Sequence, residues 1–352
     1  MECGLIGLQG VGKTLLFQAL TSHAVPVQVG SMKPNIGIAS IPDPRLDRIA
    51  DFIPTEKMIY ATIQVVDIPG LPQGATGGAL GEVLANIRQV DALCHVVRCF
   101  DDGLGVPDPQ VAIISMDGEL ILADLVVVEG AVNKAARAAR SGDKEAIKRL
   151  AVLEKCQSLL ELEKPIRDGT WDQDDLLILK SYGMMTAKPV LFVANVGEDD
   201  IDGSSDVAKA VVAHAKKING HVIVLCAEIE SEIAELDVSD RGEMLESMAI
   251  AEPALGAFAR GANDLMGLAT FYTAGEKEIR SWSIPIGASA PEAAGAIHSD
   301  LQRGFIRAEC YHVDDLFELG NEKAIKEAGK MRSEGKGYAM QDGDVAHILF
   351  NV

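Results

Sequence analysis

The chain has 352 residues, 48% of them hydrophobic, and carries a formal net charge of −20. A chain of this length is expected to form two or three domains, and its hydrophobic content is sufficient for packed cores. The acidic balance argues against a surface that binds nucleic acid over a wide area, because such surfaces are basic.

In chain order, the first predicted element is a phosphate-binding loop at residues 7–14. The loop reads Gly-Leu-Gln-Gly-Val-Gly-Lys-Thr, which matches the pattern G-x-x-x-x-G-K-[ST]. The apolar residues 3–6 are expected to form a strand before it, and residues 15–20 a helix after it. In that setting, backbone N–H groups of the loop and the helix N-terminus point at phosphate oxygens. Lys13 then reaches the β- and γ-phosphates, and the hydroxyl of Thr14 binds Mg²⁺.

Four further short apolar runs are predicted to be strands. They cover residues 63–66, 92–97, 189–194 and 221–225, and the first of them ends at Asp67. Runs that are apolar almost throughout are typical of parallel strands covered on both faces. Helical patterns lie between several of them, which predicts an α/β fold with a doubly wound sheet.

Residues 118–180 interrupt this alternation and are predicted to form an inserted helical hairpin. Apolar residues recur every three or four positions between Ile121 and Ala139, as on one face of a helix. Residues 141–143 read Ser-Gly-Asp, which can end that helix and cap the next one. A second apolar stripe follows within residues 150–160. We expect the two stripes to pack only on each other.

From residue 269 the pattern changes to that of a small α+β domain. Residues 282–286 and 347–350 are predicted strands, and residues 290–301 a helix that starts with a proline in its first turn. Residues 342–344 read Asp-Gly-Asp and predict a turn before the last strand. This segment has more acidic than basic residues, so contact with RNA is expected only through local patches.

The cysteine pattern and the absence of targeting segments predict the compartment. Six cysteines lie at positions 3, 94, 99, 156, 226 and 310 without paired metal-ligand spacing. Cys94 and Cys99 lie in an apolar stretch and are interpreted as core thiols. No signal peptide opens the chain and no apolar run reaches about 18 residues, so no membrane span is expected. A reducing, cytoplasmic setting fits these features.

A second nucleotide motif, D-x-x-G, follows the predicted strand at residues 63–66. Asp67 is predicted to hold Mg²⁺, often through water, and the N–H of Gly70 to meet the γ-phosphate. Residues 74–81 are glycine-rich. Such a segment can be ordered by the γ-phosphate and released after hydrolysis.

Leu71 stands where Ras-like enzymes carry a glutamine that orients the attacking water. A leucine side chain cannot hydrogen-bond to water, so this route to catalysis is not expected. Gln73 lies close in the sequence and is a weaker candidate for the role. No residue is therefore assigned as catalytic, and hydrolysis without a partner is expected to be slow.

The residues expected at the nucleotide base follow the predicted strand that ends at residue 194. Residues 195–198 read Asn-Val-Gly-Glu and occupy the place of the GTPase motif N-K-x-D. Glu198 is one methylene longer than the aspartate of that motif, which disfavours its two hydrogen bonds to guanine. We expect Asn195 and nearby backbone carbonyls to contact adenine instead. Cys226 and Ala227 lie where a GTPase has its second base-contacting loop.

Seven longer stretches together resemble the YchF/Obg-like ATPase family, in the Obg-related branch of translation-factor GTPases. They lie at residues 42–46, 84–88, 95–100, 119–125, 271–275, 304–309 and 349–352. The similarity runs along essentially the whole chain. It implies a P-loop nucleotide-binding domain at 1–117 and 181–268, the helical hairpin at 118–180, and a ubiquitin-like TGS domain at 269–352.

The resemblance also implies an activity and partners. It implies ATP hydrolysis in preference to GTP hydrolysis, with Mg²⁺ as cofactor, and association with the ribosome or its large subunit in the cytoplasm. Positions that match the family motifs receive the family's roles. The phosphates are contacted by Gly10, Val11, Gly12, Lys13, Thr14 and Leu15, and the base by Asn195, Val196, Glu198, Cys226 and Ala227. The switch contains Asp67, Gly70 and Leu71, and the Mg²⁺ site contains Thr14, Ser31 and Asp67.

Three features depart from the family pattern. Gln9 and Gly10 replace a proline and an asparagine of the usual loop, and that asparagine is of the kind that can hold an activating K⁺. Ser31 replaces the switch threonine but keeps the hydroxyl, and Lys33 stands where an acidic residue is usual. These changes predict a divergent member with weak turnover. The alternatives are a GTPase of the same fold and a nucleotide-sensing binding module with little catalysis.

Overall fold

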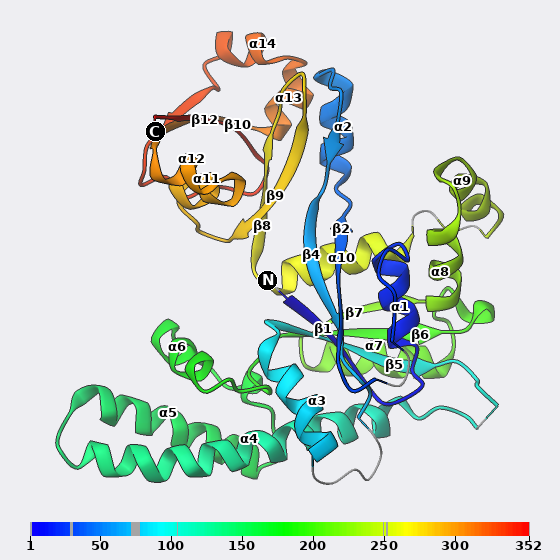
Figure 1. The fold of residues 1–352 in the computed structure, drawn as a ribbon, viewed down its shortest axis with the longest axis vertical. Coiled ribbons are helices and arrows are strands. Elements are labelled where there is room, and N and C mark those ends of the chain that lie inside the picture. The colour runs from blue at the N-terminus through cyan, green and yellow to red at the C-terminus, as the bar shows by residue number, and fades with distance from the viewer. Residues whose placement is uncertain are drawn as a thin grey trace. The chain divides into compact units, whose positions relative to one another are not determined.

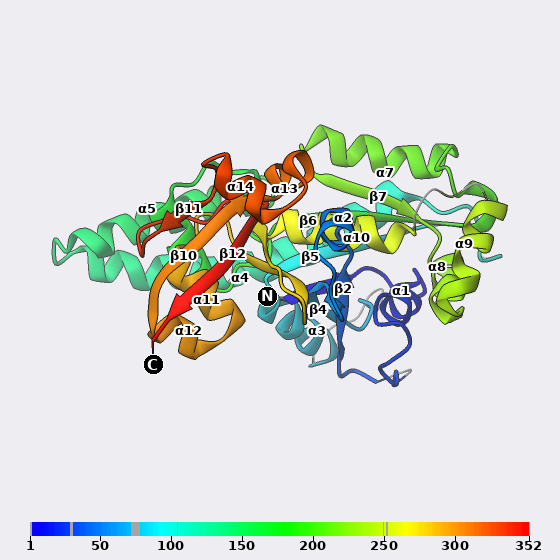
Figure 2. The same ribbon diagram turned by 90° about the horizontal axis from the view of Figure 1, so that it is seen from above.

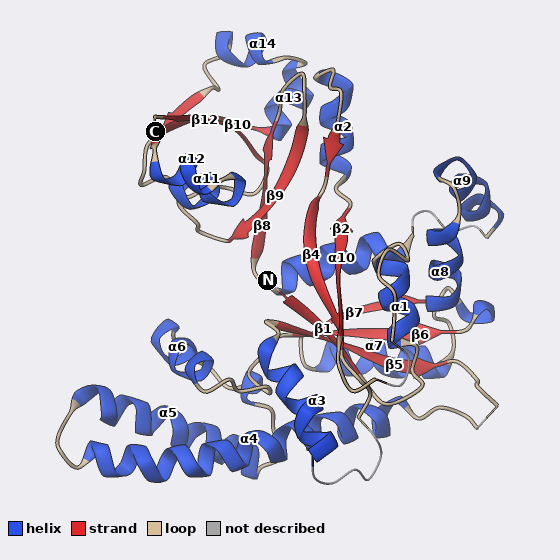
Figure 3. Cartoon of the chain, viewed as in Figure 1, coloured by secondary structure: helices blue, strands red, loops and turns tan. Residues whose placement is uncertain are grey.

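The structure is a computed structural model that describes residues 2–28, 31–71, 78–103, 105–248, 250 and 253–351. The chain divides into two compact units (Figure 1). Unit 1 contains Met1–Gly37 and Gln64–Ala254, and unit 2 contains Ile38–Ile63 and Leu255–Val352. Figure 3 shows the helices and the strands of each unit. None of the described helices combines the length and the apolar character that crossing a membrane requires.

The first sheet has the strand order β2-β4-β1-β5-β6-β7. Its strands are β1 (Glu2–Ile6), β2 (Asn35–Ile41), β4 (Ala61–Asp67), β5 (Ala92–Cys99), β6 (Val190–Val196) and β7 (His221–Leu225). The pairs β1–β4, β1–β5, β5–β6 and β6–β7 are all parallel. The predictions of a strand before the phosphate loop and of four later parallel strands are confirmed, whereas β2 was not predicted.

Helices cover both faces of this sheet, as buried parallel strands require. Helix α7 (Asp206–Lys217) lies on one side of β6 and β7, and helix α1 (Lys13–Leu20) lies on the other (Figure 2). Every residue of β6 is buried between these layers. The helices α3 (Gly78–Gln89), α8 (Ala227–Glu235) and α9 (Val238–Ser247) also belong to unit 1.

The inserted hairpin consists of α4 (Pro109–Ala139) and α5 (Lys144–Glu161). Helix α4 begins earlier than the predicted boundary at residue 118. Asp108 caps it by accepting a hydrogen bond from the N–H of Val111, and a proline occupies its first turn. The predicted stop between the helices is confirmed, because Gly142 has a φ of 78° and Asp143 caps α5.

The apolar stripes of α4 and α5 face each other, and Val128 and Leu153 are fully buried between them. The expectation that the stripes pack only on each other is wrong. The same hydrophobic cluster contains side chains from η1 (Ile166–Asp168) and α6 (Gln173–Ser181), together with Met184. The return segment of the insertion therefore completes the core of the hairpin.

The second sheet has the strand order β11-β10-β12-β8-β9-β3. Its strands are β3 (Met58–Ile59), β8 (Leu268–Thr273), β9 (Ile279–Pro285), β10 (Phe305–His312), β11 (Arg332–Glu334) and β12 (Asp344–Phe350). The helices of this part are α2 (Pro44–Phe52), α10 (Ala254–Leu265), α11 (Ala290–Ile297), α12 (Ser299–Arg303), α13 (Val313–Leu319) and α14 (Glu322–Glu327). The two strands predicted in this segment correspond to β9 and β12.

Residues 290–301 form two helices, α11 and α12, rather than the single helix predicted. Between them His298 has an extended backbone, with a φ of −163°. The Nδ1 atom of His298 accepts a hydrogen bond from the N–H of Asp300 and so caps α12. A side chain that caps a new helix competes with continuation of the preceding one. The apolar pattern of these residues does not reveal that competition.

Residues 38–63 belong to unit 2 although most of that unit lies much later in the sequence. Asp43 begins α2 by accepting a hydrogen bond from the N–H of Arg45. The same carboxylate accepts a second hydrogen bond, of 2.6 Å, from the hydroxyl of Tyr272 in β8. The compact units therefore differ from the predicted domain boundaries, because residues 38–63 and 255–268 join the C-terminal segment.

Candidate nucleotide site

The phosphate loop connects β1 to α1. Gly7 follows β1 with a φ of 150°, and Gly12 precedes α1 with a φ of 91°. A Cβ atom at Gly12 would lie 2.3 Å from Nδ2 of Asn195, and one at Gly7 would lie 2.5 Å from the carbonyl oxygen of Val96. Only glycine permits this path. The loop thus turns tightly into the N-terminus of α1, where backbone N–H groups favour an anion.

Lys13 is the first residue of α1 and is only 6% exposed. Its Nζ donates hydrogen bonds to the carbonyl oxygens of Gly7, at 3.1 Å, and Leu8, at 2.7 Å. Burial lowers the pKa of Lys13 to about 8, and the negative charge of Asp67 opposes that shift. A phosphate group beside Lys13 would favour its charged form in the same way. The loop therefore wraps a buried ammonium group.

Asp67 ends β4 and is 4% exposed. Its Oδ2 accepts a hydrogen bond of 2.9 Å from the hydroxyl of Thr14 and one of 3.0 Å from Nδ2 of Asn35. Asn35 is the first residue of β2 and was not among the predicted site residues. No local signal marked it, because β2 was not predicted and Asn35 lies 32 positions from Asp67 in the chain. Three elements thus converge on one carboxylate.

These groups line one cavity of about 460 Å³. Ser31 lies on its wall, with Oγ accepting a hydrogen bond of 3.0 Å from the N–H of Lys33. Gly70 lies close to the loop, because a Cβ atom there would be 2.9 Å from the Cα of Gln9. The structure therefore gathers these predicted residues around one space: Gly10, Lys13, Thr14, Leu15, Ser31, Asp67 and Gly70.

The polar groups of this cavity have the chemistry that suits Mg²⁺. The hydroxyls of Thr14 and Ser31 and the carboxylate of Asp67 supply hard oxygen ligands. Mg²⁺ commonly uses one or two such protein oxygens and completes its shell with water and phosphate. Among the described residues, no cluster of three or more His, Cys, Asp or Glu side chains can hold a metal ion. The oxygens of Thr14, Ser31 and Asp67 therefore fit Mg²⁺ as ligands.

Leu71 is 4% exposed and belongs to the main hydrophobic core of unit 1. Its N–H donates to the carbonyl oxygen of Gly7, so the residue is held beside the loop by its backbone. The side chain therefore packs in the core. Gln73 and residues 74–77 of the glycine-rich segment lie outside the described residues, and α3 begins at Gly78.

Asn195 lies near the end of β6 and is 3% exposed. Its side-chain amide both donates and accepts a hydrogen bond within the protein. Its Nδ2 donates to the carbonyl oxygen of Val11 at 3.0 Å, and its Oδ1 accepts from the N–H of Ala227 at 2.9 Å. An asparagine amide with these two bonds retains one N–H and one lone pair. The side chain thus ties the phosphate loop to the N-terminus of α8, a role that the sequence did not predict.

The structure does not bring the other predicted base residues to one surface. Val196 lies in the hydrophobic core, whereas Glu198 at the start of η2 (Glu198–Asp200) is exposed. Cys226 precedes α8, and burial raises the pKa of its thiol. Ala227 is 1% exposed. Of these four side chains, only that of Glu198 is freely available to solvent.

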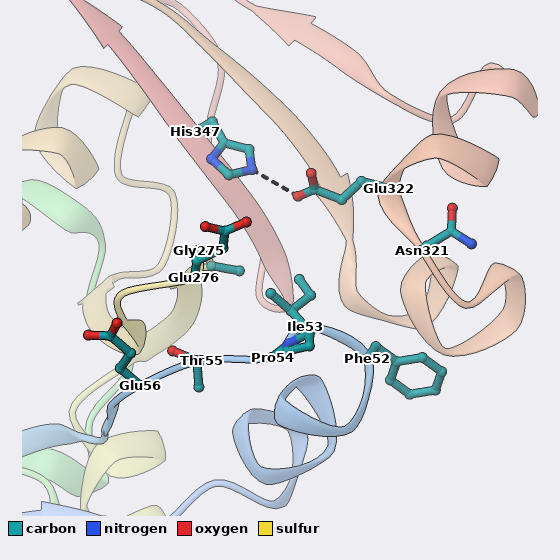
Figure 4. A pocket seen from close by; sticks show the side chains of 11 residues that line it. Phe52, Ile53, Pro54, Thr55, Glu56, Gly275, Glu276, Asn321, Glu322 and His347 are labelled. Atoms are coloured by element: carbon teal, nitrogen blue, oxygen red, sulfur yellow. Dashed lines mark hydrogen bonds and ion pairs between the residues drawn. The ribbon is translucent and has the colours of Figure 1, made fainter.

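Unit 2 contains a larger cavity, of about 740 Å³ (Figure 4). Its polar wall includes Glu56, Glu276, Glu322 and His347, and its apolar wall includes Phe52. The hydrogen bond between Nε2 of His347 and Oε1 of Glu322, 2.9 Å long, raises the pKa of the histidine. Three carboxylates make this cavity unfavourable for phosphate. The cavity at the loop is therefore the better candidate for a nucleotide site, although it is smaller.

Comparison with known proteins gives matches along the whole chain. Residues 2–124 match a family described as 50S ribosome-binding GTPase, and residues 268–351 match YchF-GTPase_C, described as a protein of unknown function (DUF933). A protein of Pasteurella multocida named ribosome-binding ATPase YchF is 43% identical over 361 residues, which cover 100% of this chain and 99% of that protein. The protein of the same name from Bacillus subtilis is 41% identical, with 100% of both chains covered.

A solved structure shows the same fold. The structure of the YchF GTPase of Schizosaccharomyces pombe is similar with a TM-score of 0.87 and 28% sequence identity, over 99% of this chain and 97% of that chain. The α/β fold and the family resemblance predicted from the sequence are both confirmed. The chain belongs to the YchF family.

Proposed function

We propose that this protein is a ribosome-associated regulatory ATPase that binds Mg²⁺ and ATP at residues 7–14 and hydrolyses the nucleotide slowly. The observation that carries the proposal is the cavity in which Lys13, Thr14 and Asp67 meet beneath a glycine loop. The full-length similarity to proteins named ribosome-binding ATPases supports the same activity and partner.

Each part of the cavity has a role in this proposal. The backbone from Gly10 to Leu15 wraps the phosphates, and Lys13 places its positive charge on the β- and γ-phosphates. Thr14, Ser31 and Asp67 hold Mg²⁺, directly or through water. When bound, Mg²⁺ would neutralise part of the negative charge of the phosphates. The hydrogen bond between Thr14 and Asp67 keeps both oxygens at one end of the cavity.

The base preference that we propose is ATP over GTP. A guanine site of the N-K-x-D type needs a lysine and an aspartate, and this chain has the buried Val196 and the longer, exposed Glu198 instead. An aspartate accepts two hydrogen bonds from guanine in a fixed geometry, which an extra methylene displaces. Asn195 takes part mainly by positioning the loop, and Cys226 and Ala227 border the base through their backbone.

Slow hydrolysis follows from the position of Leu71. The side chain is in the core, so it leaves the attacking water unoriented. An arginine supplied by a partner is worth about 10³–10⁵ in rate for enzymes of this type. We therefore propose that turnover depends on the ribosome, and we propose no catalytic side chain. A GTPase and a nucleotide-sensing module with little catalysis are the alternatives.

The proposed organisation follows from the family resemblance. We propose a nucleotide-binding domain at 1–117 and 181–268, an inserted hairpin at 118–180 and a TGS domain at 269–352. We also propose that the protein acts in the cytoplasm on the ribosome or its large subunit. The acidic character of the chain limits any contact with RNA to local patches.

Calorimetry with Mg²⁺–ATP and Mg²⁺–GTP tests the site. Lys13→Met is expected to lower ATP affinity at least about a hundredfold, or about 2.7 kcal/mol, because a buried charge on the phosphates is lost. Lys188→Met is the matched control. The Nζ of Lys188 also donates to backbone carbonyls, those of Ile87 and Arg88, and burial lowers its pKa to about 8 as well. Wild-type affinity in Lys13→Met would overturn the proposed site.

Two further measurements separate the alternatives. Tighter binding of GTP than of ATP by the wild-type protein favours the GTPase. Single-turnover hydrolysis with and without ribosomes separates an ATPase from a binding module, because a module gives no product in either condition. Cosedimentation with ribosomes in each nucleotide state tests the proposed partner independently of the chemistry.

A further inference from the structure

One side of helix α4 presents large aliphatic side chains to solvent. Val111 is 62% exposed, Ile114 68%, Leu122 61% and Val126 71%. At 100° per residue these four positions fall on one face of the helix. The opposite face packs into the two hydrophobic cores of unit 1 through Ile113, Met116, Leu120 and Val128. The exposed stripe is therefore additional to the apolar surface that the fold of this unit uses.

Gly118 lies in the middle of this stripe. Glycine is unfavourable in a helix interior relative to alanine, because it loses more backbone freedom on folding. Its φ is not positive, and a Cβ atom built at Gly118 meets no heavy atom of the described residues within 4 Å. Within the described part of the chain, neither backbone strain nor packing therefore requires a glycine there. A glycine at this position allows a second helix to approach α4 closely. The distance between packed helices depends on the size of the side chains at the crossing.

The stripe is arranged symmetrically about that glycine. Ile114 and Leu122 lie four residues on either side of Gly118, and Val111 and Val126 lie seven and eight residues away. In an antiparallel pair of α4 helices crossing at Gly118, Ile114 of each copy faces Leu122 of the other. Val111 then faces Val126. A two-fold interface requires this kind of self-complementary surface, in which each contact occurs twice.

We propose that this protein forms a reversible homodimer through antiparallel packing of its α4 helices, with the two Gly118 residues at the crossing. The stripe spans 16 residues from Val111 to Val126, about 24 Å of helix. An interface of that length lies at the small end of specific interfaces, so the dimer is weak and depends on protein concentration. The Val111 end of the stripe lies beside the phosphate loop, because Val111 lines a cavity that also contains Gln9, Gly10 and Val11.

The charge of the chain predicts how such a dimer responds to salt. Each copy carries a formal charge of −20. The antiparallel arrangement also brings Glu129 near the partner's Asp108, at each end of the stripe. Salt screens this repulsion and strengthens apolar contacts. The dimer is therefore expected to become tighter as ionic strength rises. Electrostatic binding of this protein to a basic protein or to a polyanion would instead become weaker as ionic strength rises.

Sedimentation velocity of the full-length protein over a range of concentrations tests the proposal. The wild-type protein is expected to pass from monomer to dimer, with a lower Kd at higher salt. Leu122→Glu is expected to raise the Kd at least about tenfold, because it buries charge at both contacts. Ile147→Glu is the matched control, since Ile147 is a 48% exposed isoleucine on α5 outside the stripe. A wild-type monomer at every concentration overturns the proposal, as does equal association of wild type and Leu122→Glu.

A double variant tests the direction of the helices. When Ile114→Lys and Leu122→Glu are combined in one chain, antiparallel packing places each lysine against the partner's glutamate. The double variant is therefore expected to associate more tightly than either single variant. Parallel packing places like charges together and predicts the reverse, which would overturn the proposed arrangement.

Gly118→Ala separates the interface from the fold. In the monomer this change is expected to raise the melting temperature, because alanine favours the helix and the site has room for a methyl group. In the dimer it is expected to raise the Kd severalfold, because the methyl groups meet at the crossing. Unchanged association together with a raised melting temperature would show that the helices do not cross at Gly118. If the wild type stays monomeric and Leu122→Glu abolishes ribosome cosedimentation, the face belongs to a ribosomal partner and the dimer is refuted.

Discussion

Both units bury a carboxylate at the end or start of a strand, but the two carboxylates have different surroundings. In unit 1, Asp67 is 4% exposed and accepts hydrogen bonds from the neutral side chains of Thr14 and Asn35, at the wall of a cavity. In unit 2, Asp344 is 0% exposed. Its oxygens accept bonds from Nη2 of Arg332 at 2.6 Å, the hydroxyl of Tyr338 at 2.8 Å and a backbone N–H at 3.0 Å.

The difference indicates what each carboxylate contributes. Neutral donors beside open space can be exchanged for a metal ion or its water ligands, so Asp67 is available for binding. Asp344 is satisfied by a positive charge and by two further donors, which makes it part of the fold. We therefore expect substitutions at Asp67 to change mainly nucleotide affinity, and substitutions at Asp344 to change mainly the stability of unit 2.

The two tryptophans allow this comparison to be measured. Trp171 lies in unit 1 and Trp282 in unit 2. Each is anchored by a hydrogen bond from Nε1, to the carbonyl oxygen of Ile166 and to the hydroxyl of Thr273 respectively. Variants that keep only one tryptophan, with phenylalanine at the other position, report the unfolding of each unit by fluorescence.

The largest effect on stability is expected for Asp344→Ala. The change removes the buried acceptor of the Tyr338 hydroxyl and of the Arg332 guanidinium, which is 39% exposed and keeps Glu334 as a partner. The expected cost is about 1–3 kcal/mol in the free energy of unfolding of unit 2. Urea denaturation followed through Trp282 measures it. Glu327→Ala removes an exposed carboxylate and is expected to change stability by less than about 0.5 kcal/mol. A comparable loss of ATP affinity in Asp344→Ala would contradict the separation of roles.

A smaller effect, on affinity, is expected for Asp67→Asn. Loss of the charge weakens the hold on Mg²⁺, and ATP affinity is expected to fall about tenfold or more, or about 1.4 kcal/mol. The free energy of unfolding of unit 1, followed through Trp171, is expected to change by less than about 1 kcal/mol. Calorimetry with and without Mg²⁺ shows whether the substitution weakens binding of the metal ion or binding of the phosphates. A loss of the same size without Mg²⁺ would count against a metal role for Asp67.

Asn35→Ala is expected to have a weaker effect of the same kind. Removal of one neutral hydrogen bond to the Asp67 carboxylate costs about 1 kcal/mol, which corresponds to about a fivefold loss of Mg²⁺–ATP affinity. The control is Asn133→Ala, because Asn133 is exposed on α4. If Asn35→Ala binds as the wild type does, Asn35 contributes nothing to positioning Asp67.

The smallest effect is expected from pH and concerns unit 2 alone. The hydrogen bond to Glu322 raises the pKa of His347, and the same bond lowers the pKa of Glu322. The histidine contribution is complete below its unfolded pKa of about 6.5 and is lost as pH rises through the higher folded value. The glutamate contribution is complete above its unfolded pKa of about 4.3 and is lost as pH falls through the lower folded value.

The pair is therefore expected to stabilise unit 2 most between about pH 4.5 and 6.5, by less than about 1 kcal/mol because both side chains are partly exposed. Urea denaturation followed through Trp282 at pH 6 and pH 8 measures the decline. His347→Gln should remove this part of the pH dependence. An unchanged slope in that variant would assign the pH dependence to other groups.

Much of unit 1 was predictable from the sequence because its determinants are local. The glycines and the lysine of residues 7–14 have few alternative conformations between a strand and a helix. The apolar runs that became β4, β5, β6 and β7 have no polar face, so they must be covered on both sides. Asp143 and the preceding glycine end one helix and begin the next within a few residues.

The sequence pattern was less informative where polar side chains form hydrogen bonds to residues that are distant in the sequence. Spacing predicted Asp67 and Thr14, since each belongs to a motif. It did not predict that Asn35 bonds to Asp67, or that Asn195 uses its amide to join the phosphate loop to α8. Several donors of similar chemistry are available to each carboxylate and amide, and only packing decides which one is near.

The sequence by itself determined the phosphate loop, the parallel strands and the capped hairpin, because each depends on residues within one short segment. It also determined the family, because seven motifs along the chain agree. Only the tertiary structure decided that residues 38–63 join unit 2, where Asp43 meets a tyrosine 229 positions later. It also decided that the side chain of Leu71 lies in the core and that the aliphatic stripe of α4 remains exposed. Periodicity defines the faces of a helix or strand, but the burial of a face depends on elements that are remote in the chain.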